Sequence, residues 1–179
     1  DGEISSGRNI ILSGYCLYGG STQCVIATNE RCAMYQLNPK DKFFKCINPK
    51  LTMPVMGTIY AINESNKFSW IDPRYCKVVN KFISKGYTAR WVASLVADAH
   101  RTIIKGGFFA YPGNKKNLSG KIRLLYEAYP FAFIFEKVGG VSSSGEVNLL
   151  DVPFPKTNIH AKTPIILAGK SEFDTFTTL

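Results

Sequence analysis

One proline, Pro130, constrains the fold of this chain more than any other residue, because it decides how the stretch between residues 119 and 140 can fold. Proline fits the first turn of a helix, and the residue before a proline tends to avoid the helical conformation. The sequence therefore predicts a helix that begins near Pro130. This helix should end at Gly139-Gly140, because glycine readily adopts the left-handed conformation that closes a helix.

The residues before this proline are predicted to form a strand over residues 121–127. Alternate side chains of a strand share a face, so one face should carry Lys121, Arg123, Leu125 and Glu127. Open α/β sheets bind ligands beyond the carboxyl ends of their strands, where Lys and Arg suit phosphate and a carboxylate suits a hard cation such as Mg²⁺. A solvated edge strand with a surface pair between Arg123 and Glu127 is the alternative, and this stretch alone supports both interpretations.

The composition describes a globular chain. Hydrophobic residues make up 45% of the 179 residues and charged residues 20%, which is typical of a protein that forms a core. No apolar run approaches the roughly 20 residues of a membrane span, and the N-terminus has no signal-peptide pattern. We therefore expect a cytoplasmic protein without a membrane partner. The chain starts at Asp1 rather than at methionine, so we expect a processed or truncated protein or a fragment.

The net charge of +9 is compatible with nucleic acid, a membrane surface or a small anionic substrate. Nucleic-acid-binding proteins concentrate Lys and Arg on one element and place stacking aromatic residues between them. Here the densest basic clusters are only Lys115-Lys116 and the scattered Lys77, Lys81 and Lys85. We expect no nucleic-acid partner.

Residues that commonly bind metals or act as nucleophiles form no recognisable motif. The chain has five cysteines, which are Cys16, Cys24, Cys32, Cys46 and Cys76. Their odd number and the lack of a Cys-x-x-Cys motif indicate neither a zinc site nor a disulfide framework, so we expect reduced thiols. The two histidines, His100 and His160, occur singly, and a packed or surface histidine is the favoured interpretation.

Two patterns follow each other along the chain. Short β-prone runs with tight connections predict a four-stranded meander, with strands near residues 9–18, 22–28, 32–37 and 43–47. A break at residues 48–54 marks a boundary, after which strands and helices alternate. The expected strands are 57–62, 108–112 and 164–169, and the expected helices are 72–86, 90–105 and a last one from about residue 171.

Helical periodicity predicts which side chains the first two helices bury. The first should bury Tyr75, Val78, Val79, Phe82 and Ile83. The second should bury Val92, Leu95, Val96, Ala99 and Ile103. Glycines at 86 and at 106–107 should end them.

Several segments, in this order along the chain, together resemble fructose-1,6-bisphosphatase. They are residues 7–9, 14–19, 59–64, 90–102, 106–112, 121–127, 159–160 and 164–167. The similarity covers nearly the whole chain and corresponds to roughly the C-terminal half of the family's protein. It implies a layered α/β (α+β) sugar-phosphatase fold of mixed β-sheets flanked by helices, a homotetramer, and Mg²⁺-dependent removal of the 1-phosphate from fructose 1,6-bisphosphate in gluconeogenesis. Mn²⁺ or Zn²⁺ is a possible substitute for Mg²⁺.

The resemblance assigns substrate-binding roles to six residues. Lys121, Tyr111 and Asn63 match residues that hold the distal 6-phosphate and the sugar. Arg123 falls in the segment that lines the substrate pocket. Arg90 matches an arginine that reaches the 6-phosphate of a neighbouring subunit, and Ser94 lies in the adjoining substrate segment.

The resemblance also implies a division of labour between two domains. Residues 1–52 would be the strand-rich remnant of an N-terminal domain that binds metal and AMP, and residues 53–179 a sugar-phosphate-binding α/β domain. Glu127 matches a metal-ligating glutamate, but the family's other ligands come from an Asp-Pro-x-Asp-Gly-Ser-type segment that this sequence lacks. We therefore expect little or no turnover from this chain alone.

Two departures from the family pattern leave other functions open. The family usually has tyrosine where this chain has Trp91 and Asn66, so two phenolic hydroxyls are absent. Sedoheptulose-1,7-bisphosphatase is the close alternative, although the run at residues 96–101 favours the fructose enzyme. A non-catalytic sugar-phosphate-binding or assembly subunit is the alternative from another class.

Overall fold

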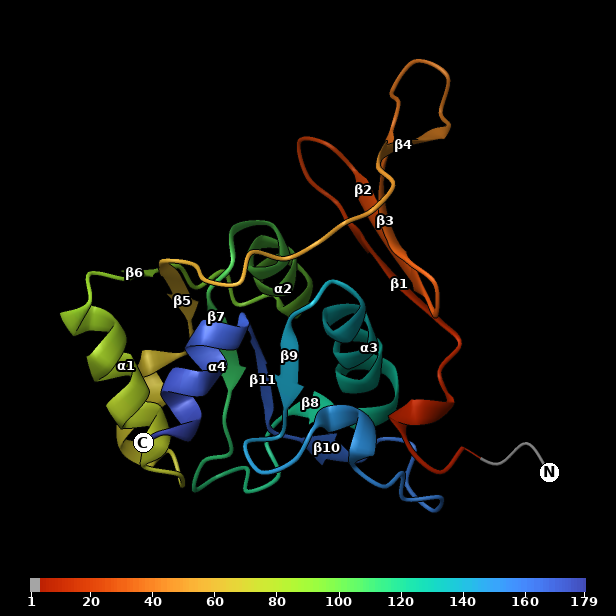
Figure 1. Cartoon of the computed structure of the whole chain (residues 1–179). Helices are drawn as coiled ribbons and strands as arrows, with labels where there is room; N and C mark the ends of the chain where they lie inside the picture. The colour runs from red at the N-terminus through yellow and green to blue at the C-terminus, as the bar shows by residue number, and fades with distance from the viewer. Residues whose placement is uncertain (1–3) are drawn as a thin grey trace.

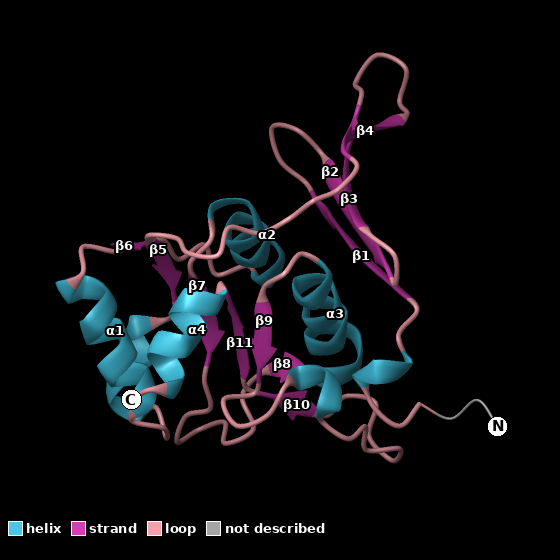
Figure 2. Cartoon of the chain, in the orientation of Figure 1, coloured by secondary structure: helices cyan, strands magenta, loops and turns pink. Residues whose placement is uncertain are grey.

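The computed structural model describes residues 4–179, and within them the chain forms sheets of four and five strands, a two-stranded ribbon and four α-helices (Figure 1 and Figure 2). The four-stranded sheet is antiparallel in the order β1-β2-β3-β4 and projects beyond the rest of the molecule in Figure 1. Its strands are β1 Leu12–Leu17, β2 Gln23–Thr28, β3 Cys32–Leu37 and β4 Phe44–Asn48. The predicted meander is confirmed.

The five-stranded sheet is mixed and has the order β6-β5-β7-β11-β9. Its strands are β5 Ile59–Ala61, β6 Thr88–Ala89, β7 Phe108–Tyr111, β9 Val141–Ser143 and β11 Ile165–Ala168. β5 is parallel to both β6 and β7, whereas β11 is antiparallel to β7 and to β9. The ribbon pairs β8 Ile122–Arg123 with β10 Lys162–Thr163. Together these elements confirm the expected layered fold of mixed sheets and helices.

Helices cover both faces of the five-stranded sheet (Figure 2). α1 Arg74–Ser84 and α4 Lys170–Thr177 pack on one face, and α2 Leu95–Lys105 and α3 Tyr129–Lys137 on the other. Alternation along β7 divides the core accordingly, because Phe109 packs with α2 and α3 while Phe108 packs with α1 and α4. Beyond α2 and α3 lies the four-stranded sheet, where Tyr15 stacks on Phe131 with ring centroids 5.2 Å apart.

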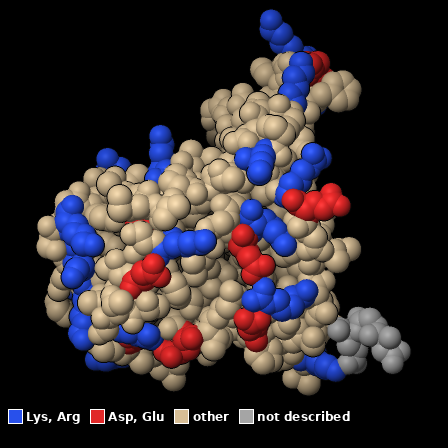
Figure 3. Space-filling view, viewed as in Figure 1, with Lys and Arg blue, Asp and Glu red and all other residues tan. Residues whose placement is uncertain are grey.

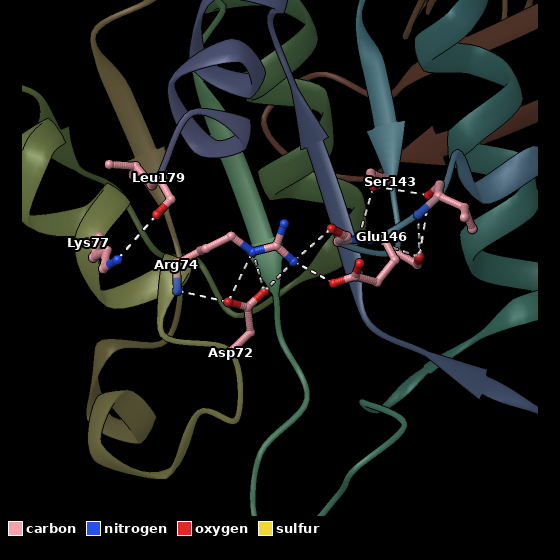
Figure 4. Close-up of polar contacts among 9 residues, drawn as sticks. Asp72, Arg74, Lys77, Ser143, Glu146 and Leu179 are labelled. Atoms are coloured by element: carbon pink, nitrogen blue, oxygen red, sulfur yellow. Dashed lines mark hydrogen bonds and ion pairs between the residues drawn. The ribbon is translucent and has the colours of Figure 1, made fainter.

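The first helix begins close to the predicted start, at Arg74 instead of residue 72. The Asp72 carboxylate accepts the Arg74 N–H at 2.8 Å, and Gly86 follows the last turn with φ 77°. The Arg74 guanidinium continues this network to Asp72 and Glu146, which links α1 to the loop after β9 (Figure 4). The predicted burial holds for Tyr75, Val78, Val79 and Phe82, but it is wrong for Ile83, which is 52% exposed at the end of the stripe.

The second helix is shorter than the predicted 90–105. It begins at Leu95, because Ala93 has φ 65° and Ser94 is extended at φ −124°. The Val92 N–H donates to the Asp98 carboxylate instead of to a helical carbonyl, and the Val92 side chain is 55% exposed. The predicted end is confirmed, since Gly106 follows with φ 72°.

The predicted strand over residues 121–127 is wrong. Only Ile122–Arg123 is extended, and Leu124–Ala128 is a π-helix that runs directly into α3. In this wide turn the Tyr129 N–H donates to the Leu124 carbonyl, five residues back. Proline cannot donate a backbone hydrogen bond, so a regular helix is disfavoured across Pro130. The wide turn accommodates this, and helical structure starts at Leu124, six residues before Pro130.

The predicted end of α3 is confirmed. Gly139 adopts φ 85°, and the Gly140 N–H donates to the Phe135 carbonyl at 2.8 Å. Short 3₁₀ turns at Gly7–Asn9, Glu64–Ser69 and Leu149–Asp151 complete the chain. None of the helices within residues 4–179 is long and apolar enough to cross a membrane. Figure 3 shows Lys and Arg dispersed over one face of the molecule among acidic residues.

Candidate functional site

Three of the predicted site residues follow the carboxyl ends of three neighbouring parallel strands. Asn63 lies two residues after β5, Arg90 directly follows β6, and Tyr111 is the last residue of β7. The parallel pairing of Ala61 with Phe109 places Asn63 and Tyr111 at the same level. The carboxyl edge of an α/β sheet is where such folds bind ligands. The structure therefore brings these residues to one edge, which we call the β6-β5-β7 edge.

Asn63 and Tyr111 line the same shallow hollow, which is too narrow to hold a water molecule. The Asn63 side-chain oxygen accepts hydrogen bonds from the Ser65 N–H at 3.2 Å and from the Ser65 hydroxyl at 2.6 Å, so its orientation is fixed. Asn66, where the family pattern has a tyrosine, lines the hollow too. Asn114, a buried residue of the turn after β7, closes another side.

A loop at residues 90–94 carries two further predicted residues. Arg90 is exposed, and its guanidinium donates to the Ala89 carbonyl at 3.3 Å. Ser94 is exposed at the start of α2 and makes no side-chain capping hydrogen bond. Neither side chain is therefore committed to an acidic partner within residues 4–179.

Asp98 positions this loop, and the sequence reasoning assigned it no role. Its carboxylate is fully buried, accepts the Val92 N–H at 3.2 Å and accepts the Arg101 guanidinium at 2.6 Å. A buried charge is retained only when it is paired and hydrogen-bonded. The sequence offered no clear signal for this role, because the predicted helix over residues 90–105 placed Asp98 in a helix interior instead of its first turn.

Trp91 lies against the third strand of the edge. Its ring is nearly parallel to that of Phe109, with centroids 6.2 Å apart and 6° between planes, and it lies 6.3 Å from the Tyr111 ring. The indole thus packs beside Tyr111 on the side of the sheet that faces α2. The departure from tyrosine is accommodated by aromatic packing.

The ribbon brings Lys121 to the neighbourhood of the same edge. Thr163 of β10 pairs with Ile122, and two residues later Ile165 pairs with Tyr111. The turn before Lys121 packs closely on this connection, because a Cβ added to Gly120 would lie 2.7 Å from the Thr163 carbonyl oxygen. Lys121 is exposed and forms no ion pair with any residue from 4 to 179.

Arg123 and Glu127 meet, but not on a strand face as predicted. The Arg123 N–H donates to Glu127 Oε2 at 2.7 Å, and the guanidinium lies 3.7 Å from Oε1. This contact joins residues four apart across a helical turn, so the shared face of Lys121, Arg123 and Glu127 inferred from strand alternation is wrong. The surface pair named as the alternative is present, between Arg123 at the end of the ribbon strand β8 and Glu127 of the π-helix, with the two side chains 47% and 30% exposed.

Glu127 does not form a metal site by itself. No group of three or more His, Cys, Asp or Glu side chains that could hold a metal ion exists in the part of the chain that the structure describes. One Glu127 oxygen already accepts the Arg123 N–H. A hard divalent cation needs several oxygen ligands, so the donor set formed by these residues is incomplete.

The two histidines are paired with tyrosines. His100 Nδ1 lies 2.9 Å from the Tyr15 hydroxyl, and burial lowers the pKa of His100 below its ordinary value of 6.5. This agrees with the packed histidine expected from the sequence. His160 Nδ1 lies 3.0 Å from the hydroxyl of Tyr126, the residue before Glu127, and no sequence pattern predicted this contact.

The chain matches one family of known proteins along most of its length. A profile described as "Fructose-1-6-bisphosphatase, C-terminal domain" matches residues 53–179. The chain is 40% identical over 171 residues to the class 1 fructose-1,6-bisphosphatase of Sulfurihydrogenibium sp., which covers 96% of this chain and 52% of that protein. It is 36% identical over 178 residues to the cytosolic fructose-1,6-bisphosphatase of Beta vulgaris, covering 97% of this chain and 52% of that protein.

A solved structure shows the same relationship in three dimensions. The crystal structure of Leishmania major fructose-1,6-bisphosphatase in the T-state matches with a TM-score of 0.92 and 31% identity, covering 97% of this chain and 55% of that one. The chain therefore spans about half the length of the proteins that it matches.

Proposed function

The chain belongs to the fructose-1,6-bisphosphatase family, and we propose that it supplies the sugar-phosphate-binding part of a phosphatase that removes the 1-phosphate of fructose 1,6-bisphosphate. This membership confirms the resemblance and the fold expected from the sequence. The observation that carries the proposal is the convergence of Asn63, Arg90 and Tyr111 at the β6-β5-β7 edge, with Lys121 on the adjoining ribbon.

The distal phosphate is proposed to bind at this edge. Lys121 and Arg90 are exposed cations without acidic partners among the described residues, so their charges are available to an anion. The Tyr111 hydroxyl and the Asn63 amide would hydrogen-bond the phosphate or the sugar. Ser94 and Arg123 would line the adjoining substrate segment.

The cofactor is proposed to be Mg²⁺, with Mn²⁺ or Zn²⁺ as alternatives, in a longer protein of the relatives' length that would contain this sequence. Glu127 would contribute one carboxylate, and further ligands would have to come from outside the described residues. We therefore expect little or no turnover from these 179 residues alone.

The assembly and cellular setting of this activity are also proposed. We propose a homotetramer in which Arg90 reaches the substrate of a neighbouring subunit, since its guanidinium is exposed at the end of an edge strand. A cytoplasmic enzyme of gluconeogenesis is proposed, because relatives include a protein named cytosolic fructose-1,6-bisphosphatase. Nucleic acid and membranes remain outside the proposed set of partners.

Phosphate release by the longer protein tests the metal role of Glu127. Glu127→Ala should reduce Mg²⁺-dependent turnover by orders of magnitude, because removing a ligand disturbs both the ion and the activated water. Glu30→Ala, in the exposed turn between β2 and β3, is the matched control and should leave turnover unchanged. Near-normal turnover of Glu127→Ala would refute the metal role.

A non-catalytic sugar-phosphate-binding or assembly subunit is the second candidate, and the incomplete donor set around Glu127 favours it. Binding of the bisphosphate without Mg²⁺-dependent hydrolysis in the longer protein would support this candidate over the enzyme. If hydrolysis occurs, competition between fructose 1,6-bisphosphate and sedoheptulose 1,7-bisphosphate on one preparation distinguishes the fructose enzyme from the sedoheptulose enzyme.

A further inference from the structure

Two cysteines lie directly opposite each other on the first two strands of the projecting sheet. In the antiparallel pairing of β1 with β2, Cys16 is opposite Cys24. Both thiols are free and both residues are half-buried. Seven residues separate them in the sequence, so the pairing became visible only once the register of the hairpin was known.

The burial pattern places both thiols on the outer face of this sheet. On β1, Ser13 and Tyr15 point inward, where the Ser13 hydroxyl donates to the Pro130 carbonyl of α3. On β2, Val25 is fully buried on the same inner face. Because neighbouring side chains alternate, Cys16 and Cys24 both point outward and share one face.

The spacing of the two strands suits a bond between the sulfurs. Residues directly opposite in antiparallel strands have Cα atoms about 4.5–5.5 Å apart, and disulfides span Cα separations of about 4.4–6.8 Å. Burial and the neighbouring Cys16 side chain raise the pKa of the Cys24 thiol to about 11, in keeping with this pairing. The register therefore places the two cysteines within the range that a disulfide spans.

We propose that Cys16 and Cys24 are a dithiol modification site, which a low-molecular-weight disulfide such as oxidised glutathione converts reversibly into a cross-strand disulfide. The inference is independent of the proposed sugar-phosphate function, since it uses neither the β6-β5-β7 edge nor the ribbon.

The reaction proceeds by two thiol–disulfide exchanges. One of the two cysteines loses its proton, and its thiolate attacks one sulfur of oxidised glutathione. A mixed disulfide forms at that cysteine, and the first glutathione leaves as a thiolate that takes up a proton. The opposite cysteine then gives up its proton, attacks the cysteine sulfur of the mixed disulfide and releases the second glutathione, which takes up that proton. The two cysteines lose two electrons and two protons, and one oxidised glutathione becomes two reduced molecules.

Cys46 provides a matched control on the same face. It lies opposite Tyr35, which in turn lies opposite Cys24, so Cys46 is two strands away from Cys24. Adjacent strands are about 4.8 Å apart, which puts Cys46 beyond the reach of a disulfide with either member of the pair. Cys46 is also the exposed cysteine of the set, so reactivity governed by exposure alone would favour it.

Mass spectrometry of the 179-residue chain after treatment with oxidised glutathione and thiol blocking tests the proposal. We expect a linked peptide pair that contains Cys16 and Cys24 and is lighter by two hydrogens than the two reduced peptides. Cys46→Ser should leave this product unchanged. Separate glutathione adducts or free thiols at both positions, or a bond that includes Cys46, would overturn the proposal.

Two single variants test the pairing, and circular dichroism confirms that each is folded. Cys24→Ser should trap glutathione on Cys16, and Cys16→Ser should trap glutathione on Cys24, because the resolving thiol is gone in each. A disulfide to another cysteine in either variant, or no adduct in either, would contradict the pairing. The same treatment in concentrated urea should yield mixed pairings, and an equally selective bond there would show that the hairpin register is not its cause.

Discussion

Replacing Asp98 with alanine should destabilise the protein and loosen the loop at residues 90–94 that follows β6. Asp98 is fully buried, and its carboxylate joins two elements by accepting the Val92 N–H and the Arg101 guanidinium. The variant would leave the Val92 N–H without its acceptor and the guanidinium without its counterion.

The magnitude follows from the burial of the partners. Removing one member of a buried ion pair costs about 3–5 kcal/mol, because the other charge stays behind unpaired. The Arg101 side chain is 19% exposed and can reach some water, so the lower end of about 3 kcal/mol is expected for the free energy of unfolding. Arg101 Nε already lacks a partner among the described residues, which gives the arginine no second acceptor.

Urea unfolding followed by circular dichroism measures this loss. Asp174→Ala on α4 is the matched control, since Asp174 is exposed and should change the free energy of unfolding by no more than about 0.5 kcal/mol. A loss below about 1 kcal/mol for Asp98→Ala, similar to that of the control, would refute the buried-pair argument.

Two further predictions concern pH and backbone conformation. Burial lowers the pKa of His100 below its unfolded value of 6.5, so the unfolded chain binds the proton more readily and the free energy of unfolding should fall as the pH drops from 6.5 through the folded pKa. His100→Asn should flatten that part of a plot of unfolding free energy against pH. An unchanged slope in the variant would contradict this assignment. Gly107→Ala should cost about 3 kcal/mol or more in urea unfolding, because φ is 107° and the new Cβ would meet the Ile59 carbonyl oxygen at 2.1 Å. Gly86→Ala, with φ 77° and open space around it, should cost only about 1 kcal/mol, and equal losses at the two sites would show that the close approach is unimportant.

Turn-forming and helix-capping residues predicted the elements whose boundaries depend on residues adjacent in the sequence. Tight connections between β-prone runs predicted the four-stranded sheet, and Asp72 and Gly139 marked helix boundaries that the structure confirms. These features were accessible because each depends on the conformational preferences of residues adjacent in the sequence.

The segment before Pro130 was not accessible in this way. The preference of the preceding residue for extended backbone suggested a strand, but a π-turn extends the helix back to Leu124. Leu124 and Ala128 are buried with α3, so tertiary packing overrides the local preference. The same applies to the non-helical loop before Leu95, which depends on the contact between Val92 and Asp98.

The candidate site was predicted residue by residue, but its geometry was not. Asn63, Arg90 and Tyr111 come together because β5 is parallel to both of its neighbours, and strand order is invisible in the sequence. The roles assigned to these residues and the division into residues 1–52 and 53–179 stay predictions. The strand face thought to unite Lys121, Arg123 and Glu127 does not exist.

The central claim is that the β6-β5-β7 edge and its ribbon bind a phosphorylated sugar. Calorimetric titration of the 179-residue chain with fructose 1,6-bisphosphate tests this claim most directly, and unphosphorylated fructose is the ligand control. We predict saturable binding of the bisphosphate and none of fructose. Lys121→Ala should lower the affinity about 10- to 100-fold, because a charge-assisted hydrogen bond to phosphate contributes about 1.5–3 kcal/mol. Lys85→Ala, an exposed lysine after α1, should bind like the unmodified chain. No binding of the bisphosphate, or equal affinity in Lys121→Ala and Lys85→Ala, would contradict the claim.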